Sequence, residues 1–174
     1  MDLVETTRVI REIYNEGNPQ EKFEYELECA LEAKVDYIVI EPTKLGEETS
    51  RWVRVGNCLH KTSVISGLLS LVLPRVFPET PVDLELIVGI PTAVLSVACT
   101  ALYGISWQFD PCCKYQVTVN SRELSKLNVQ NLTNSSPVVL VRRDDKYRKT
   151  LHNFVSFLAG IQLLRTLDNV WRTR

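Results

Sequence analysis

The sequence lacks the motifs that usually mark an enzyme. Its 174 residues contain no glycine-rich phosphate loop, no Walker motif and no H-E-x-x-H pattern, which excludes the common nucleotide-binding and zinc-protease signatures. Histidine is scarce, because only His60 and His152 are present and each lies at the edge of an apolar segment. We interpret both as polar anchors at a membrane interface rather than as ligands or bases. We therefore predict a non-enzymatic protein without a cofactor.

Cysteine usage argues against a disulfide framework. The five cysteines are odd in number and include no C-x-x-C, which favours a reducing location. The adjacent pair Cys112 and Cys113 is unusual; we interpret it as packing, with lipidation or a redox or metal role as alternatives. Residues 1–10 are acidic and have no apolar core, so we expect neither a secretory signal nor a transit peptide there.

Charge is unevenly distributed along the chain. The net charge is only −1, which argues against nucleic-acid binding, but residues 1–61 are acidic and residues 110–174 are basic. This asymmetry indicates that the two flanks attract each other.

The strongest single signal is the segment 86–109, which contains 24 residues without a charge. As a helix it would extend about 36 Å, which exceeds the roughly 30 Å hydrocarbon core of a bilayer. Pro91 removes one helical hydrogen bond, so we expect an irregular or late first turn. Aromatic residues gather at the C-terminal end, where an aromatic belt is typical of a membrane span.

A second, shorter uncharged run covers residues 62–74. Extended to about 60–78, it reaches the minimum length of a span, with Arg75 snorkelling to the interface. We predict that 59–109 forms a transmembrane hairpin of two helices, about 60–78 and 86–109. Positive residues flank the hairpin on both outer sides, so both soluble flanks are expected in the same compartment.

Small residues recur at four-residue spacing in both predicted spans. Such ridges let helices approach closely, and we interpret them as a hairpin interface or a homo-oligomer seam. The predicted helix-packing residues are Ser63, Gly67, Gly89, Ala93, Ser96, Thr100 and Gly104.

The flanks carry the signals of a small α/β unit. In the N-terminal flank (1–58), Asn18 and Pro19 predict the start of a helix over about 19–33, and a strand follows at about 37–41. The stretch 9–14 is a weaker strand candidate. The C-terminal flank (110–174) contains strands at about 115–119 and 138–142, all too short to stand alone. We predict that they pair into one mixed sheet.

An apolar helix is expected over about 147–171. Its uncharged run, 151–164, is short for a span, so we favour an interfacial or packed amphipathic helix over a third span. The predicted fold is thus an α+β membrane protein, in which a transmembrane helical hairpin is inserted between the halves of a small α/β unit, plus a C-terminal amphipathic helix.

Five blocks of the sequence resemble the mitochondrial transmembrane protein 11 family. They are FEYELE (23–28), YIVIEPT (37–43), GNCLHKT (56–62), LYGISWQFDPCCKYQV (102–117) and PVVLVRRDDKYRKTLHN (137–153). The resemblance implies a multi-pass mitochondrial protein, usually of the inner membrane. It also implies a role in mitochondrial morphology and cristae organisation, in association with crista-junction scaffold proteins and without catalytic activity.

The leading hypothesis is therefore a non-enzymatic organiser that acts by helix packing in mitochondrial membrane lipid and by protein association outside it, with a homo-oligomer as one form of assembly. A carrier or channel subunit is the first alternative; it needs a polar path, which we expect only a homo-oligomer to build. A thiol-based redox or metal protein using Cys112 and Cys113 is the second. Outer-membrane residence is the alternative location.

Overall fold

The computed structural model describes residues 6–11, 18–78, 83–118, 137–143 and 146–172. The chain divides into two compact units. We call Met1–Val55 with Pro111–Asp144 the sheet unit, and Gly56–Asp110 with Asp145–Arg174 the helical unit. The sheet unit is thus assembled from segments on both sides of the apolar region, and the helical unit from that region and the C-terminal segment. Each unit is described by itself below.

Helix α1 (Pro19–Glu32) of the sheet unit starts as its sequence predicts. The Asn18 side chain accepts a hydrogen bond from the Gln20 amide, and Pro19 takes the first helical position, where its missing N–H is not needed. The helix ends before Lys34, which has a positive φ of 53°. Phe23 and Ala30 are the buried residues of the helix, so α1 contributes one apolar face to the unit.

The sheet has the order β1-β2-β4-β3 and is mixed, so the mixed helix and sheet character predicted from the sequence is confirmed. β1 (Thr7–Ile10) pairs with β2 (Tyr37–Ile40) in parallel, and β4 (Val138–Arg142) is antiparallel to both β2 and β3 (Tyr115–Thr118). Ile38 pairs with Leu140 in the β2–β4 ladder. This ladder joins a strand that precedes the apolar segments to one that follows them.

The core of the sheet unit lies between α1 and one face of the sheet. It contains Ile10, Phe23, Ala30, Ile38, Ile40, Tyr115 and Leu140. The Tyr115 hydroxyl donates to the Val35 carbonyl over 2.8 Å, and burial raises the pKa of this phenol. Every residue of β2 is buried, which is why its sequence is continuously apolar instead of alternating.

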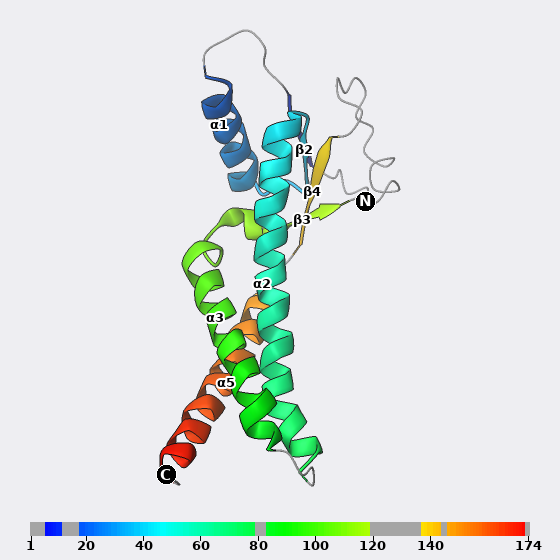
Figure 1. The fold of residues 1–174 in the computed structure, drawn as a ribbon. Helices are drawn as coiled ribbons and strands as arrows, with labels where there is room; N and C mark the ends of the chain where they lie inside the picture. Colours follow the sequence, from blue (N-terminus) through cyan, green and yellow to red (C-terminus); the bar gives the residue numbers. More distant parts are fainter. Residues whose placement is uncertain (1–5, 12–17, 79–82, 119–136, 144–145, 173–174) are drawn as a thin grey trace, which may run out of the picture. The chain divides into compact units, whose positions relative to one another are not determined.

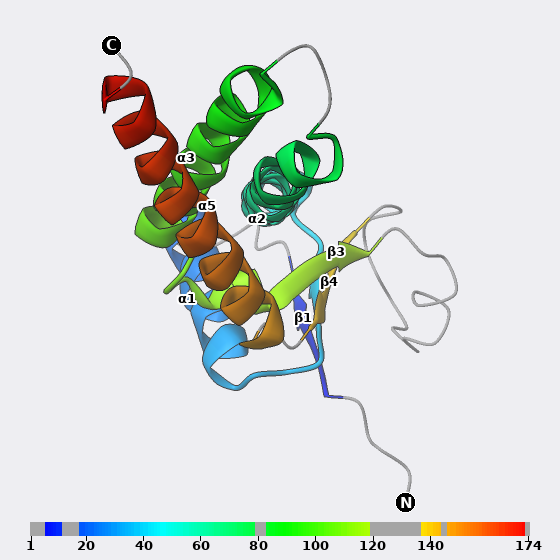
Figure 2. The ribbon, with the colours of Figure 1, turned by 90° about the horizontal axis from the view of Figure 1, so that it is seen from below.

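The helical unit contains the C-terminal part of α2 (Thr43–Val76), the π-helical turn η1 (Glu85–Gly89), α3 (Ile90–Ser106) and α5 (Lys146–Arg172). These helices lie side by side (Figures 1 and 2). The π-helical turn directly precedes Pro91, where the sequence predicts an irregular first turn. Pro91 cannot donate to a carbonyl of that turn, so the hydrogen-bond pattern changes there.

In the part of the chain that the structure describes, one helical segment, Glu85–Ser106, is long and apolar enough to cross a bilayer. Only 28% of its most apolar 18-residue window is buried. A core helix of a soluble protein would be mostly covered, so this exposure agrees with a lipid-facing helix.

Two boundaries differ from the sequence prediction. Helix α2 begins at Thr43, well before residue 60, near which the first hairpin helix was predicted to start. The prediction was too late because it placed the start of the helix from the apolar run alone. The preceding charged turns are also helical: Gly46 packs on Ile40 and Val138, and Val53 is buried. The first strand, β1, covers Thr7–Ile10 instead of 9–14, and residues 12–14 lie outside the described residues.

Candidate functional site

A cluster of hydroxyl groups lies at the centre of the helical unit. The Ser63 hydroxyl of α2 contacts the Thr100 hydroxyl of α3 at 2.7 Å and the Ser156 hydroxyl of α5 at 2.8 Å. Ser96 donates to the Ser63 carbonyl over 2.8 Å. Ser63 and Ser96 are completely buried. Hydrogen bonds of this kind between membrane helices contribute about 0.6–2 kcal/mol each, so the cluster joins all three helices.

The two histidines meet next to this hydroxyl cluster. The Nδ1 atoms of His60 and His152 are 3.0 Å apart, although the residues are 92 positions apart in sequence. The second ring nitrogen of His152, Nε2, lies 3.0 Å from the Thr100 hydroxyl. Tyr103 packs against both rings. His60 and His152 are buried, with exposed fractions of 8% and 1%, so the prediction that they are polar anchors at a membrane interface is wrong.

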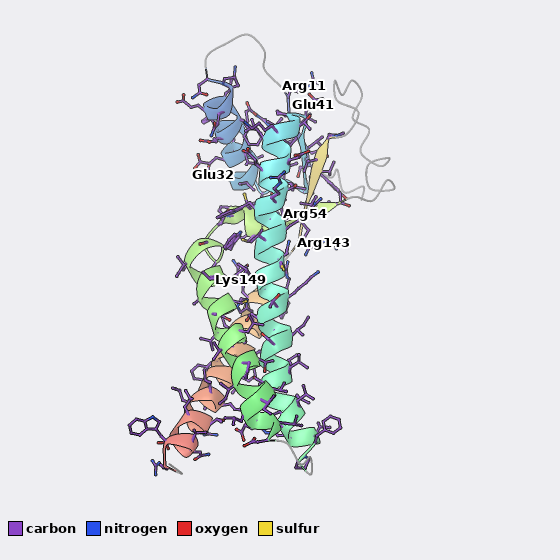
Figure 3. All side chains as sticks on the ribbon, in the orientation of Figure 1. Arg11, Glu32, Glu41, Arg54, Arg143 and Lys149 are labelled. Carbon is purple, nitrogen blue, oxygen red and sulfur yellow. The ribbon has the colours of Figure 1, made fainter. Side chains whose placement is uncertain are left out.

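Further polar contacts lie on either side of the centre. Toward the start of α5, Arg148 Nη2 donates to Asn57 Oδ1 over 2.5 Å and Lys149, labelled in Figure 3, donates to the Gln108 carbonyl over 2.8 Å. Toward the other end, Gln162 donates to the Ser70 carbonyl over 3.0 Å. Thr166 donates to the Glu85 carboxylate over 2.5 Å. The interior of the unit is therefore polar along much of its length.

The outer surface of the same unit is apolar. Large apolar side chains are exposed on all three helices. They include Ile65, Leu68, Leu69 and Val72 on α2, Leu86 and Ile87 on η1, Val94, Leu95, Val97, Leu102 and Ile105 on α3, and Leu151, Phe154, Phe157, Leu164 and Leu167 on α5. A water-soluble bundle exposes mainly polar side chains. An apolar outer surface over an interior with many polar groups instead suits a unit surrounded by lipid.

Most of the predicted helix-packing residues lie inside the helical unit. A Cβ atom added at Gly67 would lie 2.7 Å from both Ser96 Oγ and Val155 Cγ1, so α2 approaches α3 and α5 closely there. Ala93 has an exposed fraction of 1%, and Gly89 lies beside Pro74. With Ser63, Ser96 and Thr100 in the hydroxyl cluster, six of the seven residues face other helices of the same chain.

Gly104 is different. A Cβ atom there would meet only Gln108 Oε1, at 3.5 Å, on the following turn. Gly104 is thus the one predicted packing residue of the seven that has no other described helix of this chain close to it. A neighbouring chain could approach there.

Cys112 and Cys113 lie in the short 3-10 helix η2 (Pro111–Lys114) of the sheet unit. Both residues are buried and both are thiols. Attachment of an acyl chain requires an exposed thiol, so this burial disfavours lipidation of the folded unit. Among the described residues, no group of three or more His, Cys, Asp or Glu side chains is arranged to hold a metal ion.

Sequence reasoning missed the contribution of α5 to the polar interior. The four-residue spacing that selected the packing residues of α2 and α3 also relates His152, Ser156 and Gly160, and it would have indicated a third packing helix. It also missed that one chain can enclose polar groups. Ser63, Thr100 and Ser156 meet within one chain; the expectation that a polar path needs a homo-oligomer stays a prediction.

The comparisons with known proteins agree on one family. Residues 6–168 match the family described as mitochondrial morphogenesis regulator. The chain is 58% identical to Transmembrane protein 11, mitochondrial, of Danio rerio over 87% of this chain and 79% of that protein. It is 53% identical to the Homo sapiens protein of the same name over 94% of this chain and 83% of that protein. No solved structure matches the chain.

Proposed function

The chain belongs to the mitochondrial morphogenesis regulator family, and from this premise we propose that it organises mitochondrial shape and cristae by protein–protein association, without catalysis. It is a mitochondrial membrane protein, as its relatives are named. The observation that carries the mechanism is the helical unit, whose interior contains polar as well as apolar side chains and whose outer surface is apolar. Such an outer surface is suited to lipid and to other membrane helices.

Pairing of β2 with β4 supports a multi-pass topology. Because the two strands are hydrogen-bonded neighbours, the chain before α2 and the chain after α3 lie on one side of the membrane. The segment between them must then cross the bilayer an even number of times. Since Glu85–Ser106 is a candidate span, we propose that α2 provides the return crossing and forms a transmembrane hairpin with α3.

The depth at which Ser156 would lie in the bilayer supports a third membrane crossing, by α5. Ser96 lies at the middle of Glu85–Ser106, so it would sit near the centre of the bilayer. Ser156 Oγ lies 3.4 Å from Ser96 Oγ and 2.5 Å from Thr100 Oγ1, so α5 reaches the same depth. An interfacial helix would stay in the headgroup region. We therefore favour three crossings, with α5 packed in the bundle and its exposed phenylalanines in lipid.

This topology predicts that the two ends of the chain lie in different compartments. A single reactive cysteine added before Thr6 and one added after Arg174, each in a background without native cysteines, should be modified by a bulky impermeant maleimide from opposite sides of the membrane. Intact mitochondria and mitoplasts would be compared. Modification of both ends from the same side would contradict the third crossing and leave only the hairpin.

We place the protein in the inner membrane, with crista-junction scaffold proteins as its partners; outer-membrane residence is the alternative. The same maleimide comparison separates the two locations, since an inner-membrane protein has both ends inaccessible in intact mitochondria and one of them accessible in mitoplasts, whereas an outer-membrane protein exposes one end in intact mitochondria. Homo-oligomers are a second form of association. The open surface around Gly104 and the exposed Ile105 supports such a contact.

Complementation tests the function directly. In human cells that lack the relative named Transmembrane protein 11, mitochondrial, this chain should restore tubular mitochondria and regular cristae, as scored by electron microscopy. Affinity purification from the same cells should recover crista-junction scaffold proteins. Correct mitochondrial insertion without any recovery of morphology would contradict the proposed function.

A further inference from the structure

The pair formed by His60 and His152 is an unusual element for the interior of a membrane bundle. Both rings are buried, and they face each other through Nδ1 at 3.0 Å. Neither the family name nor helix packing accounts for two ionisable groups there. Ionisable side chains within membrane segments are costly, and in most cases they have a functional role.

The number and position of the ring protons decide whether the contact between His60 Nδ1 and His152 Nδ1 is a hydrogen bond. A neutral imidazole carries a proton on one nitrogen only. For two Nδ1 atoms to form a hydrogen bond, one ring must be protonated at Nδ1 and the other must be protonated at Nε2. If His60 is the donor, His152 Nε2–H donates in turn to Thr100 Oγ1, 3.0 Å away. In the neutral pair, the hydrogen bond between the two Nδ1 atoms can thus form only between opposite tautomers.

Adding protons changes this contact in two steps. One additional proton gives an imidazolium and a neutral ring, which still share an N–H···N bond. A second additional proton places an N–H on both facing nitrogens, and the contact must open. Because the two rings belong to α2 and α5, opening the contact separates these helices at the level of the hydroxyl cluster.

Cations lie close to the pair on two of its helices. Lys61 on α2 directly follows His60 in the chain, Arg148 on α5 lies one helical turn before His152, and α3 contributes the Tyr103 ring. Arg148 is held by Asn57 through Nη2, whereas its buried Nη1 has no hydrogen-bond partner among the described residues. Additional positive charge on the rings therefore adds to an existing excess of positive charge on α2 and α5.

We propose that His60 and His152 form a proton-binding site inside the helical unit, in which proton uptake weakens the packing of α2 against α5. The ligand is the proton itself. The hydroxyls of Thr100, Ser63 and Ser156 can each donate or accept, so they can reorient when the tautomers exchange. The packing of the membrane unit thereby responds to pH.

Nuclear magnetic resonance gives a direct test, because the chain contains only two histidines. In the full chain with ¹⁵N-labelled histidine in lipid nanodiscs at pH 8, we expect opposite tautomers for the two rings and a coupling across the Nδ1–H···Nδ1 bond. On acidification both rings should change together, since coupled groups titrate as a pair. In His152→Gln the remaining ring should titrate at a different pH from that of the wild type.

An exposed histidine in the same chain provides a reference for the titration of His60 and His152. Tyr147 is exposed on α5, with an exposed fraction of 83%, so Tyr147→His adds an imidazole that titrates independently. Independent titration of His60 and His152 at the pH of this reference would overturn the proposal. Signals that stay unchanged from pH 8 down to the pH at which the helical unit unfolds would also overturn it, since the pair would then be a purely structural contact.

Thermal unfolding supplies a second measurement that does not depend on resolving the tautomers. Between pH 7.5 and 5.5 we expect the wild type to lose about 6 °C more in Tm than the variant with both His60→Gln and His152→Gln. The sign follows because the unfolded chain binds protons that the neutral folded pair does not, so stability falls as pH falls. Equal pH dependence of the two proteins would contradict the proposal.

Discussion

Replacing Gly67 with leucine is expected to lower the stability of the helical unit by about 2–3 kcal/mol, as is typical when a packed interior is overfilled. The first added carbon already lies 2.7 Å from both Ser96 Oγ and Val155 Cγ1. One of these atoms belongs to α3 and the other to α5, so neither helix can move without disturbing the hydroxyl cluster. The gain in helix propensity, about 0.8–1.0 kcal/mol, offsets only part of this loss.

Gly104→Leu is the matched control, because it makes the same change in the same predicted set of packing residues. Its Cβ atom would meet only Gln108 Oε1 at 3.5 Å, so the monomer should keep its Tm. Thermal unfolding in detergent compares the two variants, and native gels report self-association. We expect Gly67→Leu to unfold earlier and Gly104→Leu to weaken only the oligomer. Equal melting of both variants would show that close approach at Gly67 contributes nothing.

Replacing Ile38 with aspartate is expected to unfold the sheet unit. Ile38 has an exposed fraction of 0%, and its register partner Leu140 is equally buried. The described residues that form this core with Phe23 and Tyr115 are all apolar or aromatic, and burial of an unpaired charge costs several kcal/mol. We expect a loss of at least about 4 kcal/mol, measured as lost hydrogen-exchange protection in β2 and β4.

Ile38→Val is the conservative comparison for this site. It removes one buried methylene and should cost only about 0.5–1.5 kcal/mol. Protection of β2 and β4 should therefore survive in this variant. Retained protection in the aspartate variant as well would mean that the sheet does not depend on this core.

The two pairs of variants separate the contributions of the two units. A defect in morphology that follows Gly67→Leu, with Gly104→Leu active, would assign function to the packing of the chain's own helices. The opposite result would assign it to association between chains. Variants of Ile38 test whether the sheet, in which β2 pairs with β4, is needed for packing of the chain's own helices or for association between chains.

Local signals were sufficient where a few neighbouring residues decide the structure. Asn18 and Pro19 specify the start of α1, since a side-chain oxygen and a missing N–H act within one turn. Residues 37–40, 115–118 and 138–142 have β-branched, short sequences, and each forms a strand. The start of α2 could not be placed in this way, because Thr43 to Leu59 is charged and helical without a continuous apolar run.

The sequence by itself determined that this protein is embedded in a membrane and which family it resembles, because an uncharged run and specific blocks such as 102–117 are properties of consecutive residues. Only the tertiary structure decided what α5 does. His152 and Ser156 are ordinary polar residues in an apolar stretch until the fold brings them to His60 and Ser63, 92 and 93 positions away. Contacts over such separations depend on how three helices pack, and no local pattern encodes the distance between two ring nitrogens.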